Sequence, residues 1–283
     1  KILIITDAST RLAALRGGKL DMLNAVEWRD AEDVMKTNPN IKATEEYTWN
    51  QDYIYFMTDG PPMNDVRVRR ALMMAIDRSS IVTDRQKGHA SIIPSGMVAP
   101  GHALYQPLEE RPATTREMFT YNPDKAKQLL TEAGFPSGFK TTIFFISRDE
   151  PTASLVKAYW SKISVDADLK VLEPAAYTTQ LYGRAFPPGT LAITVWAFAW
   201  GNWSWVWQPG ANWNFCRMTD QKLMDLIYEG TQNYVDWNKW VKDWKAINSY
   251  VVDQAYENVL PGANVRTLWQ PWVKGYHGEY YLG

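Results

Sequence analysis

The chain has 283 residues, enough for one or two domains with a hydrophobic core of useful size. A formal net charge of −1 gives no reason to expect nucleic acid or an acidic membrane surface as a partner, and no apolar run reaches membrane-spanning length. The single cysteine, Cys216, excludes a disulfide framework or a cysteine-based metal cluster within this chain.

The first predicted elements are short. Residues 2–5 read as a buried strand, which is too short for the apolar region of a signal peptide. Residues 10–16 predict a helix that ends at Gly17, because glycine readily takes the conformation that closes a helix. A further strand is expected over residues 20–23 and a further helix over residues 30–35.

The segment 61–77 carries the clearest local signals. Two consecutive prolines end a strand-like aromatic run at residues 53–57, and Asn64 or Asp65 can then cap a helix. The helix has apolar residues at the spacing of one buried face, namely Val68, Ala71, Leu72, Ala75 and Ile76. Its arginines, Arg67, Arg69 and Arg70, fall mostly on the other side, so we predict a solvated helix face with some salt bridges.

Later elements alternate between strands and helices. Asn122, Pro123 and Gly134 mark the cap, first turn and end of a helix over residues 122–134. The elements expected after it are a strand at 141–147, a helix at 151–163, a strand at 169–172, a helix at 175–186, a strand at 191–199 and helices at 219–228 and 236–254. This order predicts α/β layering. Residues 89–117, rich in proline and glycine, read as a long loop.

Tryptophan is the compositional outlier, with 14 residues. Six lie in one interval: Trp196, Trp200, Trp203, Trp205, Trp207 and Trp213. Between residues 173 and 220 there is no Asp or Glu, and the only charged side chains are Arg184 and Arg217. If residues 200–205 form a strand, Trp203 and Trp205 lie on one face.

That interval has the composition of a site that stacks flat molecules and offers amide hydrogen bonds. The alternative is that several indoles are core residues. The candidate ligand-binding residues are Trp196, Trp200, Asn202, Trp203, Trp205, Asn214, Arg184 and Arg217.

The sequence offers no catalytic or metal-binding pattern. His89, His102 and His277 are far apart, and a nucleophile elbow, a P-loop and a pair of catalytic carboxylates are all missing. We therefore predict no catalytic residue, no metal and no cofactor. The density of tryptophan alone suggests a carbohydrate-active enzyme as an alternative. Such an enzyme needs two carboxylates, which the tryptophan-rich interval lacks.

Several motifs together carry a family resemblance. The segment Pro61–Asp77 resembles the signature helix of the family 5 extracytoplasmic solute-binding proteins, the peptide- and nickel-binding receptors of bacterial ABC importers. Residues 14–21, 122–134 and 268–279 resemble further family segments in the family's order. By this resemblance the chain is the C-terminal half of a longer protein, and the first half, with its signal peptide, precedes it.

The resemblance implies an α/β fold of the periplasmic-binding-protein type II kind, with one complete distal lobe and part of the basal lobe. Residues 1–57 are expected to form part of the basal lobe and a crossing strand. Residues 58–265 would form the distal lobe, and residues 266–283 would return to the basal lobe. The segments that cross between lobes would be residues 53–57 and 266–269.

The resemblance also implies a function. The protein would be an extracytoplasmic receptor, periplasmic or lipid-anchored and monomeric when full-length. It would capture an oligopeptide-like or other small polar solute between its lobes and deliver it to ABC permease subunits. In peptide-binding members the loop that matches residues 196–205 carries a Trp followed by an Asp for the ligand's amino group, and that Asp is missing here. A neutral or anionic ligand such as an oligosaccharide therefore fits well, and a nickel complex is a further alternative.

Overall fold

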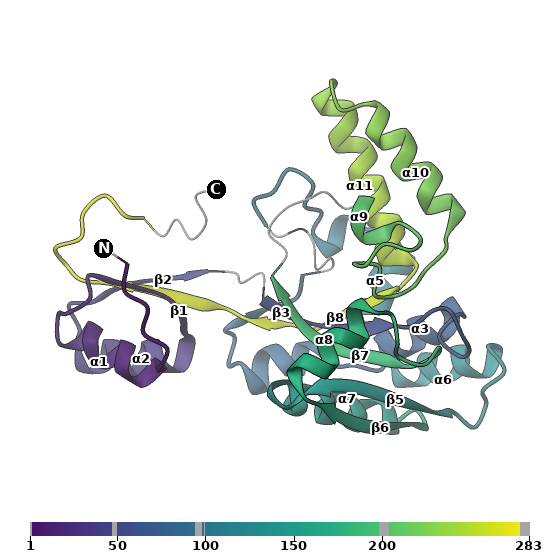
Figure 1. The fold of residues 1–283 in the computed structure, drawn as a ribbon, viewed down its shortest axis with the longest axis horizontal. Helices are drawn as coiled ribbons and strands as arrows, with labels where there is room; N and C mark the ends of the chain where they lie inside the picture. The colour runs from purple at the N-terminus through teal and green to yellow at the C-terminus, as the bar shows by residue number, and fades with distance from the viewer. Residues whose placement is uncertain (1, 47–49, 94–97, 99, 198–203, 278–283) are drawn as a thin grey trace. The chain divides into compact units, whose positions relative to one another are not determined.

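The computed structural model describes residues 2–46, 50–93, 98, 100–197 and 204–277. The chain forms two compact units, which we describe separately (Figure 1). The small unit comprises Lys1–Thr48, Val82–Ser91 and Gly262–Gly283. The large unit comprises Trp49–Ile81 and Ile92–Pro261.

The small unit is built on a three-stranded antiparallel sheet in the order β1-β10-β2. Its strands and helices are α1 (Ala8–Arg16), β1 (Met22–Glu27), α2 (Trp28–Thr37), β2 (Lys42–Glu46) and β10 (Val265–Trp269). A separate two-stranded ladder joins β4 (Ala90–Ser91) to β9 (Gly262–Ala263). The core of the unit is small and aliphatic, formed by Leu15, Val26, Ala31, Val34, Ile41 and Leu268.

A mixed five-stranded sheet organises the large unit, in the order β6-β5-β7-β3-β8. Its strands are β3 (Asn50–Phe56), β5 (Phe139–Ile146), β6 (Val165–Leu172), β7 (Leu191–Ala197) and β8 (Glu257–Val259). Strand β5 runs parallel to both β6 and β7, whereas β3 is antiparallel to both β7 and β8. The parallel strands are linked through helices, as such crossovers require.

The remaining helices follow in chain order: α3 (Val66–Met74), α4 (Arg78–Ser80), the π-helix η1 (Ile81–Arg85), the 3₁₀-helix η2 (Leu108–Glu110), α5 (Ala113–Phe119), α6 (Pro123–Glu132), the 3₁₀-helix η3 (Ser147–Asp149), α7 (Glu150–Ser161), α8 (Pro174–Tyr182), α9 (Ser204–Trp207), α10 (Gln221–Gln232) and α11 (Trp237–Asp253). None of the helices among the described residues is long and apolar enough to cross a membrane.

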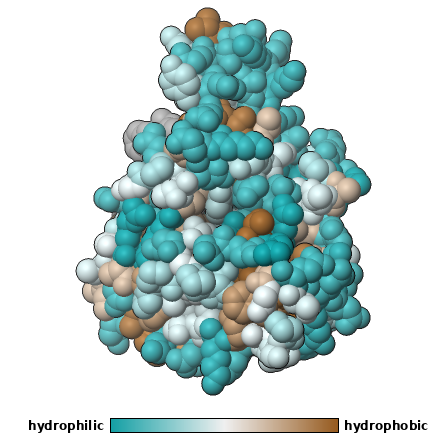
Figure 2. Space-filling model, turned by 90° about the vertical axis from the view of Figure 1, so that its right-hand side faces the viewer, coloured by the Kyte–Doolittle hydropathy of each residue, from teal (hydrophilic) through white to brown (hydrophobic). Residues whose placement is uncertain are grey.

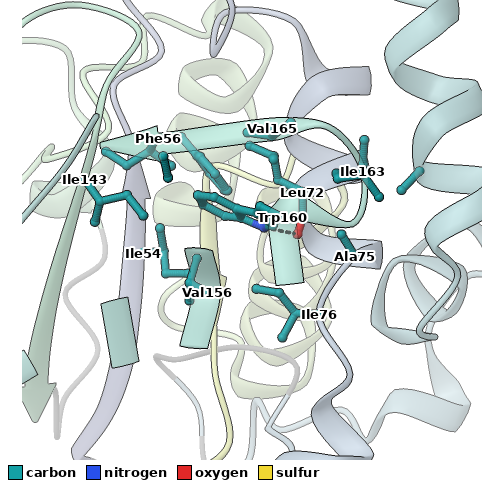
Figure 3. Packing of buried hydrophobic residues seen from close by; sticks show 14 of the residues in the cluster. Ile54, Phe56, Leu72, Ala75, Ile76, Ile143, Val156, Trp160, Ile163 and Val165 are labelled. Carbon is teal, nitrogen blue, oxygen red and sulfur yellow. Dashed lines mark hydrogen bonds between the residues drawn. The ribbon is translucent and has the colours of Figure 1, made fainter. Parts of the chain in front are cut away.

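Helices α3, α6 and α7 bury one face of the large sheet in an aliphatic core. Trp160 lies at its centre and is fully buried. Its indole Nε1 donates to the backbone oxygen of Leu72 at 2.9 Å, so the polar atom of this side chain is satisfied. Figure 3 shows it surrounded by side chains from the sheet and the helices, among them Ile54, Phe56 and Val156.

The other face of the sheet packs against α8, α10, α11 and the loop around Phe215. This core is richer in aromatic and polar groups, and it includes Tyr53, Tyr55, Tyr177 and Trp244. Helices α10 and α11 pack along each other as a hairpin that projects from the sheet (Figure 1). Figure 2 shows that most of the visible surface, including this projection, is hydrophilic.

The predicted α/β layering is confirmed, and so are several helix caps. Asp65 accepts the backbone N–H of Arg67 at 2.8 Å, and Asn122 accepts that of Lys125 at 2.9 Å. At the start of α11, Asp236 accepts the backbone N–H of Lys239 at 3.0 Å, a cap that we had not named within the helix predicted at residues 236–254. These caps were predictable because they depend on residues only two or three positions away.

Three other sequence predictions are wrong. Residues 2–5 form no strand, and Ile2 is 94% exposed. Residues 204–207 are helical, so the strand geometry proposed for residues 200–205 does not hold at Trp205. Arg69 is buried instead of solvated, and it donates to the backbone oxygens of Met63 and Gln254 at 2.7 and 2.8 Å. Backbone acceptors of this kind leave no trace in the local sequence pattern.

The bounds of the units differ from those we assigned to the lobes. Strand β3, which includes residues 53–56, pairs within the sheet of the large unit. The segment Val82–Ser91 belongs to the small unit, although it lies inside the range assigned to the distal lobe. The assignment of residues to two lobes stays a prediction.

Candidate functional site

The topology of the large sheet indicates where a ligand site is to be sought. In open α/β sheets, ligands bind beyond the carboxyl ends of the parallel strands. Strands β5, β6 and β7 end at the same edge because they run parallel. Directly after β5 comes η3, which contains Arg148 and Asp149.

A pocket of about 250 Å³ opens at this edge. Its walls come from the end of β5, from α8 and from β7, and the residues that line it are Ile146, Arg148, Pro174, Tyr177, Thr178, Leu181, Tyr182 and Thr194. The mixture of apolar and aromatic surface with a few polar groups is typical of small-molecule sites. Pro174 occupies the first turn of α8, where the missing N–H costs no hydrogen bond.

Arg148 is the charged group of the pocket. Its Nε donates to Asp149 Oδ1 at 2.8 Å and its Nη2 donates to Oδ2 at 3.3 Å. The Asp149 side chain is only 2% exposed, whereas that of Arg148 is 59% exposed, so a buried carboxylate anchors a guanidinium that solvent can reach. The hydrogen bond to Asp149 raises the pKa of Arg148, which keeps this group cationic.

Two tyrosines form much of the pocket wall. Tyr177 is buried, and its hydroxyl donates to the backbone oxygen of Ile193 at 2.7 Å. Burial raises the pKa of Tyr177 far above its usual value, so the phenol stays neutral. Tyr182 is half-buried and meets Trp213 and Phe215 edge-on, each with ring centroids 5.4 Å apart. Tyr182 therefore connects the pocket wall to aromatic side chains from the tryptophan-rich part of the chain.

Five of the predicted binding residues lie wholly or partly outside the part of the chain that the structure describes. Trp200, Asn202 and Trp203 lie outside the described residues. Trp196 belongs to β7 and Trp205 to α9, but their side chains are outside the description. A binding role for these five residues stays a prediction.

The other three candidates have described surroundings. Asn214 is buried, and its amide Nδ2 donates to the backbone oxygens of Gln208 and Met218 at 3.2 and 2.9 Å. Its Oδ1 accepts Met218 N at 3.1 Å, so the side chain holds a loop together. Arg217 is buried, and its Nη1 donates to Asp59 at 3.0 Å. Arg184 is half-buried with φ 55°, just after α8 ends. None of the three lines the pocket.

None of the residues that line the pocket is among the binding residues predicted from the sequence. A signal was available, because Arg148 follows immediately on the strand predicted at residues 141–147. A charged residue at the carboxyl end of a parallel strand is a candidate ligand contact on topological grounds alone. The predicted site was instead placed in the tryptophan-rich interval, because of its density of tryptophans.

The described residues contain no group of three His, Cys, Asp or Glu side chains that could hold a metal ion. Cys216 is buried, and its Sγ lies 3.0 Å from the backbone oxygen of Tyr256. Burial raises the pKa of this thiol, which disfavours the reactive thiolate.

The fold is shared with known binding proteins. The crystal structure of the ABC transporter substrate-binding protein CtaP from Listeria monocytogenes superposes with a TM-score of 0.80 at 18% sequence identity, over 94% of this chain and 54% of that one. The α/β fold is thus that of the type II periplasmic binding proteins.

The family follows from sequence comparison. The family model described as bacterial extracellular solute-binding proteins, family 5 middle, matches residues 1–218, and the chain belongs to this family. The heme-binding protein A of Haemophilus influenzae is 31% identical over 206 residues, which are 70% of this chain and 35% of that protein. The glutathione-binding protein GsiB of Escherichia coli is 25% identical over 280 residues, which are 95% of this chain and 50% of that protein. The chain therefore spans between about a third and a half of the relatives it matches.

Proposed function

We propose that this chain is part of the solute-binding receptor of a bacterial ABC importer, and that the pocket at the end of β5 binds an anionic group of the solute. The receptor would act outside the cytoplasm, deliver its solute to the permease subunits and perform no chemistry on it. The two compact units would represent parts of the two lobes expected for such a receptor.

The anchored guanidinium of Arg148 is the observation that carries this proposal. Arginine binds carboxylates and phosphates through parallel N–H donors. Asp149 uses two of the nitrogens of Arg148, Nε and Nη2, and thereby fixes the orientation of the plane. The remaining nitrogen, Nη1, has no hydrogen-bond partner among the described residues. A fixed, partly exposed cation beside two aromatic rings favours a ligand that has both a flat or apolar part and an acidic group.

An oligopeptide-like or similar small polar solute with a carboxylate satisfies this description. Heme and glutathione, which name two of the relatives, both carry carboxylates, so their chemistry is compatible with such a site. The second candidate is an oligosaccharide, favoured by the tyrosine rings of Tyr177 and Tyr182, since sugars stack on aromatic faces. In either case the predicted residues of the tryptophan-rich interval would supply further contacts.

The test begins with mass spectrometry of the solute that copurifies with the full-length protein. Calorimetry with that solute then compares the wild type with Arg148→Gln, which removes the charge and keeps most of the length. Loss of a charged hydrogen-bonding partner should weaken binding about 10- to 100-fold. Arg116→Gln is the matched control, because Arg116 donates to the backbone oxygen of Glu109 and does not line the pocket.

Each outcome of this test has a definite meaning. An acidic solute, recovered unchanged, whose affinity falls in Arg148→Gln but not in Arg116→Gln supports the proposal. A neutral sugar with equal affinity for all three proteins supports the oligosaccharide alternative and contradicts the role given to Arg148. Conversion of the solute during incubation contradicts the receptor function itself.

A further inference from the structure

A buried guanidinium in the large unit lacks partners for two of its nitrogens. Arg111 directly follows the 3₁₀-helix η2 and is 2% exposed. Its Nε donates to the backbone oxygen of Gln106 at 3.2 Å, whereas Nη1 and Nη2 are both buried without a hydrogen-bond partner among the described residues. Glu109 and Glu110, the acidic residues nearest to it in the sequence, are exposed. No carboxylate in the part of the chain that the structure describes therefore accepts a hydrogen bond from these two nitrogens.

The other buried arginines of the large unit differ from Arg111 in this respect. Both terminal nitrogens of Arg69 and of Arg78 donate to oxygens of the protein. Arg217 leaves its Nη2 without a partner among the described residues, but its Nη1 donates to the carboxylate of Asp59 at 3.0 Å. Where the fold buries a guanidinium, it thus supplies acceptors or a compensating charge, and Arg111 departs from this pattern.

The segment after this arginine contains a second unsatisfied polar group. Thr115 of α5 is fully buried, and its hydroxyl has no hydrogen-bond partner among the residues described. Contacts with α11 fix the segment on either side of the arginine. Gln106 Oε1 accepts a hydrogen bond from the hydroxyl of Ser249 at 3.0 Å, and the hydroxyl of Thr114 donates to Asp253 Oδ1 at 3.0 Å. The unsatisfied donors therefore belong to a short segment that is held in place at both ends.

We infer that Arg111 binds a small oxyanion, either a carboxylate or an inorganic oxyanion such as phosphate, through Nη1 and Nη2, and that the hydroxyl of Thr115 contributes to the same site. Two parallel N–H donors of a guanidinium match two oxygens of one oxyanion. A threonine hydroxyl can donate a further hydrogen bond. Burial lowers the pKa of Arg111 to about 10, so the group is still a cation at neutral pH. A buried cation without a partner costs free energy, and a bound anion offsets this cost.

The inferred anion site is separate from the pocket at the end of β5. Neither Arg111 nor Thr115 lines that pocket. The guanidinium of Arg148 already has a carboxylate beside it, whereas that of Arg111 has two nitrogens to offer. An anion that binds only the folded protein stabilises it, so we expect this site to contribute to the stability of the large unit. The inference does not depend on the proposed receptor function.

Chemical denaturation of the full-length protein at fixed ionic strength tests the site. The concentration of acetate, phosphate or chloride is raised, and a Hepes salt with its bulky sulfonate makes up the balance. For millimolar affinity, the equilibrium constant for folding should rise about tenfold between about 1 mM and about 100 mM acetate or phosphate. Arg111→Gln should abolish this dependence, and Thr115→Val should reduce it. Arg116→Gln, at an exposed position of the same segment, should retain it and thereby corrects for general effects of salts.

The response to each anion distinguishes the two sources of an oxyanion. A response to acetate supports a carboxylate as the ligand, and a response to phosphate without acetate supports an inorganic oxyanion. A response to chloride alone, the absence of any response, or a response that persists in Arg111→Gln overturns the inference.

A crystal structure of the wild type in the responding anion keeps the test valid if Arg111→Gln fails to fold. It should show the anion within hydrogen-bond distance of both Nη1 and Nη2 of Arg111. Ordered water alone at these two nitrogens overturns the inference, because water would then satisfy the donors that we assign to an anion.

Discussion

The two faces of the large sheet are built from the same strands but from different chemistry. Along β3, Ile54 and Phe56 belong to the aliphatic core, whereas Tyr53 and Tyr55 belong to the opposite core. On the aliphatic side, the indole nitrogen of Trp160 has its acceptor. On the other side, Gln51 Oε1 and Glu257 Oε2 are buried without a hydrogen-bond partner among the described residues.

This difference suggests separate roles for the two faces of the sheet: the aliphatic face stabilises the fold, and the aromatic face contributes to the proposed binding site. A polar atom buried without a partner costs free energy, and folding alone gives no reason to keep one. Asn258, which lies opposite Ile54 on the aliphatic side, also buries its Nδ2 without a partner among the described residues, so both sides carry some of this cost. The aromatic side in addition supplies residues that line the pocket, including Tyr177 and Leu181. Where packing on one face of a sheet stabilises the fold strongly, the other face can contribute less to stability.

The largest expected effect of a single change lies on the aliphatic face. Trp160→Ala removes a fully buried indole and its hydrogen bond to Leu72, so it should lower the free energy of unfolding by about 3–5 kcal/mol. Chemical denaturation followed by circular dichroism measures this loss. The control is Trp237→Ala, at a position that is 61% exposed, for which a change below about 0.5 kcal/mol is expected. Equal effects at the two positions would contradict the assignment of Trp160 to the core.

A smaller effect of opposite sign is expected on the aromatic face. Glu257 lies opposite Tyr55 across the β3–β8 ladder, and burial raises its pKa to about 8 from an ordinary value of 4.5. The folded protein therefore keeps the proton over a range in which the unfolded chain releases it. This group lowers stability progressively as the pH rises from about 4.5 to about 8.

Glu257→Gln removes this linkage while keeping the size of the side chain. It should stabilise the protein by about 1–3 kcal/mol at pH 8, a figure reduced from the full shift because part of the residue is exposed. At pH 4 the two proteins should have equal stability. Denaturation midpoints at several pH values give the measurement, and a gain that is the same at pH 4 and pH 8 would show that ionisation of Glu257 is not its cause.

How far the sequence predicts this structure depends on how local each determinant is. The helix over residues 122–134 was predictable, because its cap, its first-turn proline and its final glycine all act within the helix. The burial of Arg69 was not, because its acceptors include the backbone oxygen of Gln254, 185 residues away. The sequence predicts a helix over residues 78–88, but it does not predict that Ile81–Arg85 takes the π-helical form.

The candidate site was also hard to predict, because its residues come from separate parts of the sequence. A cluster of tryptophans is visible in the sequence, but the pocket is assembled from residues that start at Ile146 and end at Thr194. Only the strand order brings β5 beside β7 and places Arg148 opposite α8. Family resemblance predicted the fold correctly because fold depends on the whole pattern of elements. It did not identify this pocket, which depends on a few side chains.

The smallest expected effect concerns Tyr177, which belongs to both the aromatic core and the pocket wall. Tyr177→Phe keeps the ring beside Phe186 and removes the hydroxyl that donates to Ile193 O at 2.7 Å. The carbonyl loses this partner, so the free energy of unfolding should fall by about 0.5–1.5 kcal/mol. Because this hydroxyl points to the backbone, affinity for the copurified solute should change less than twofold, in contrast to Arg148→Gln. A loss of affinity without a loss of stability would contradict this expectation. It would mean that the hydroxyl contacts the solute and contributes to binding instead of to the stability of the aromatic core.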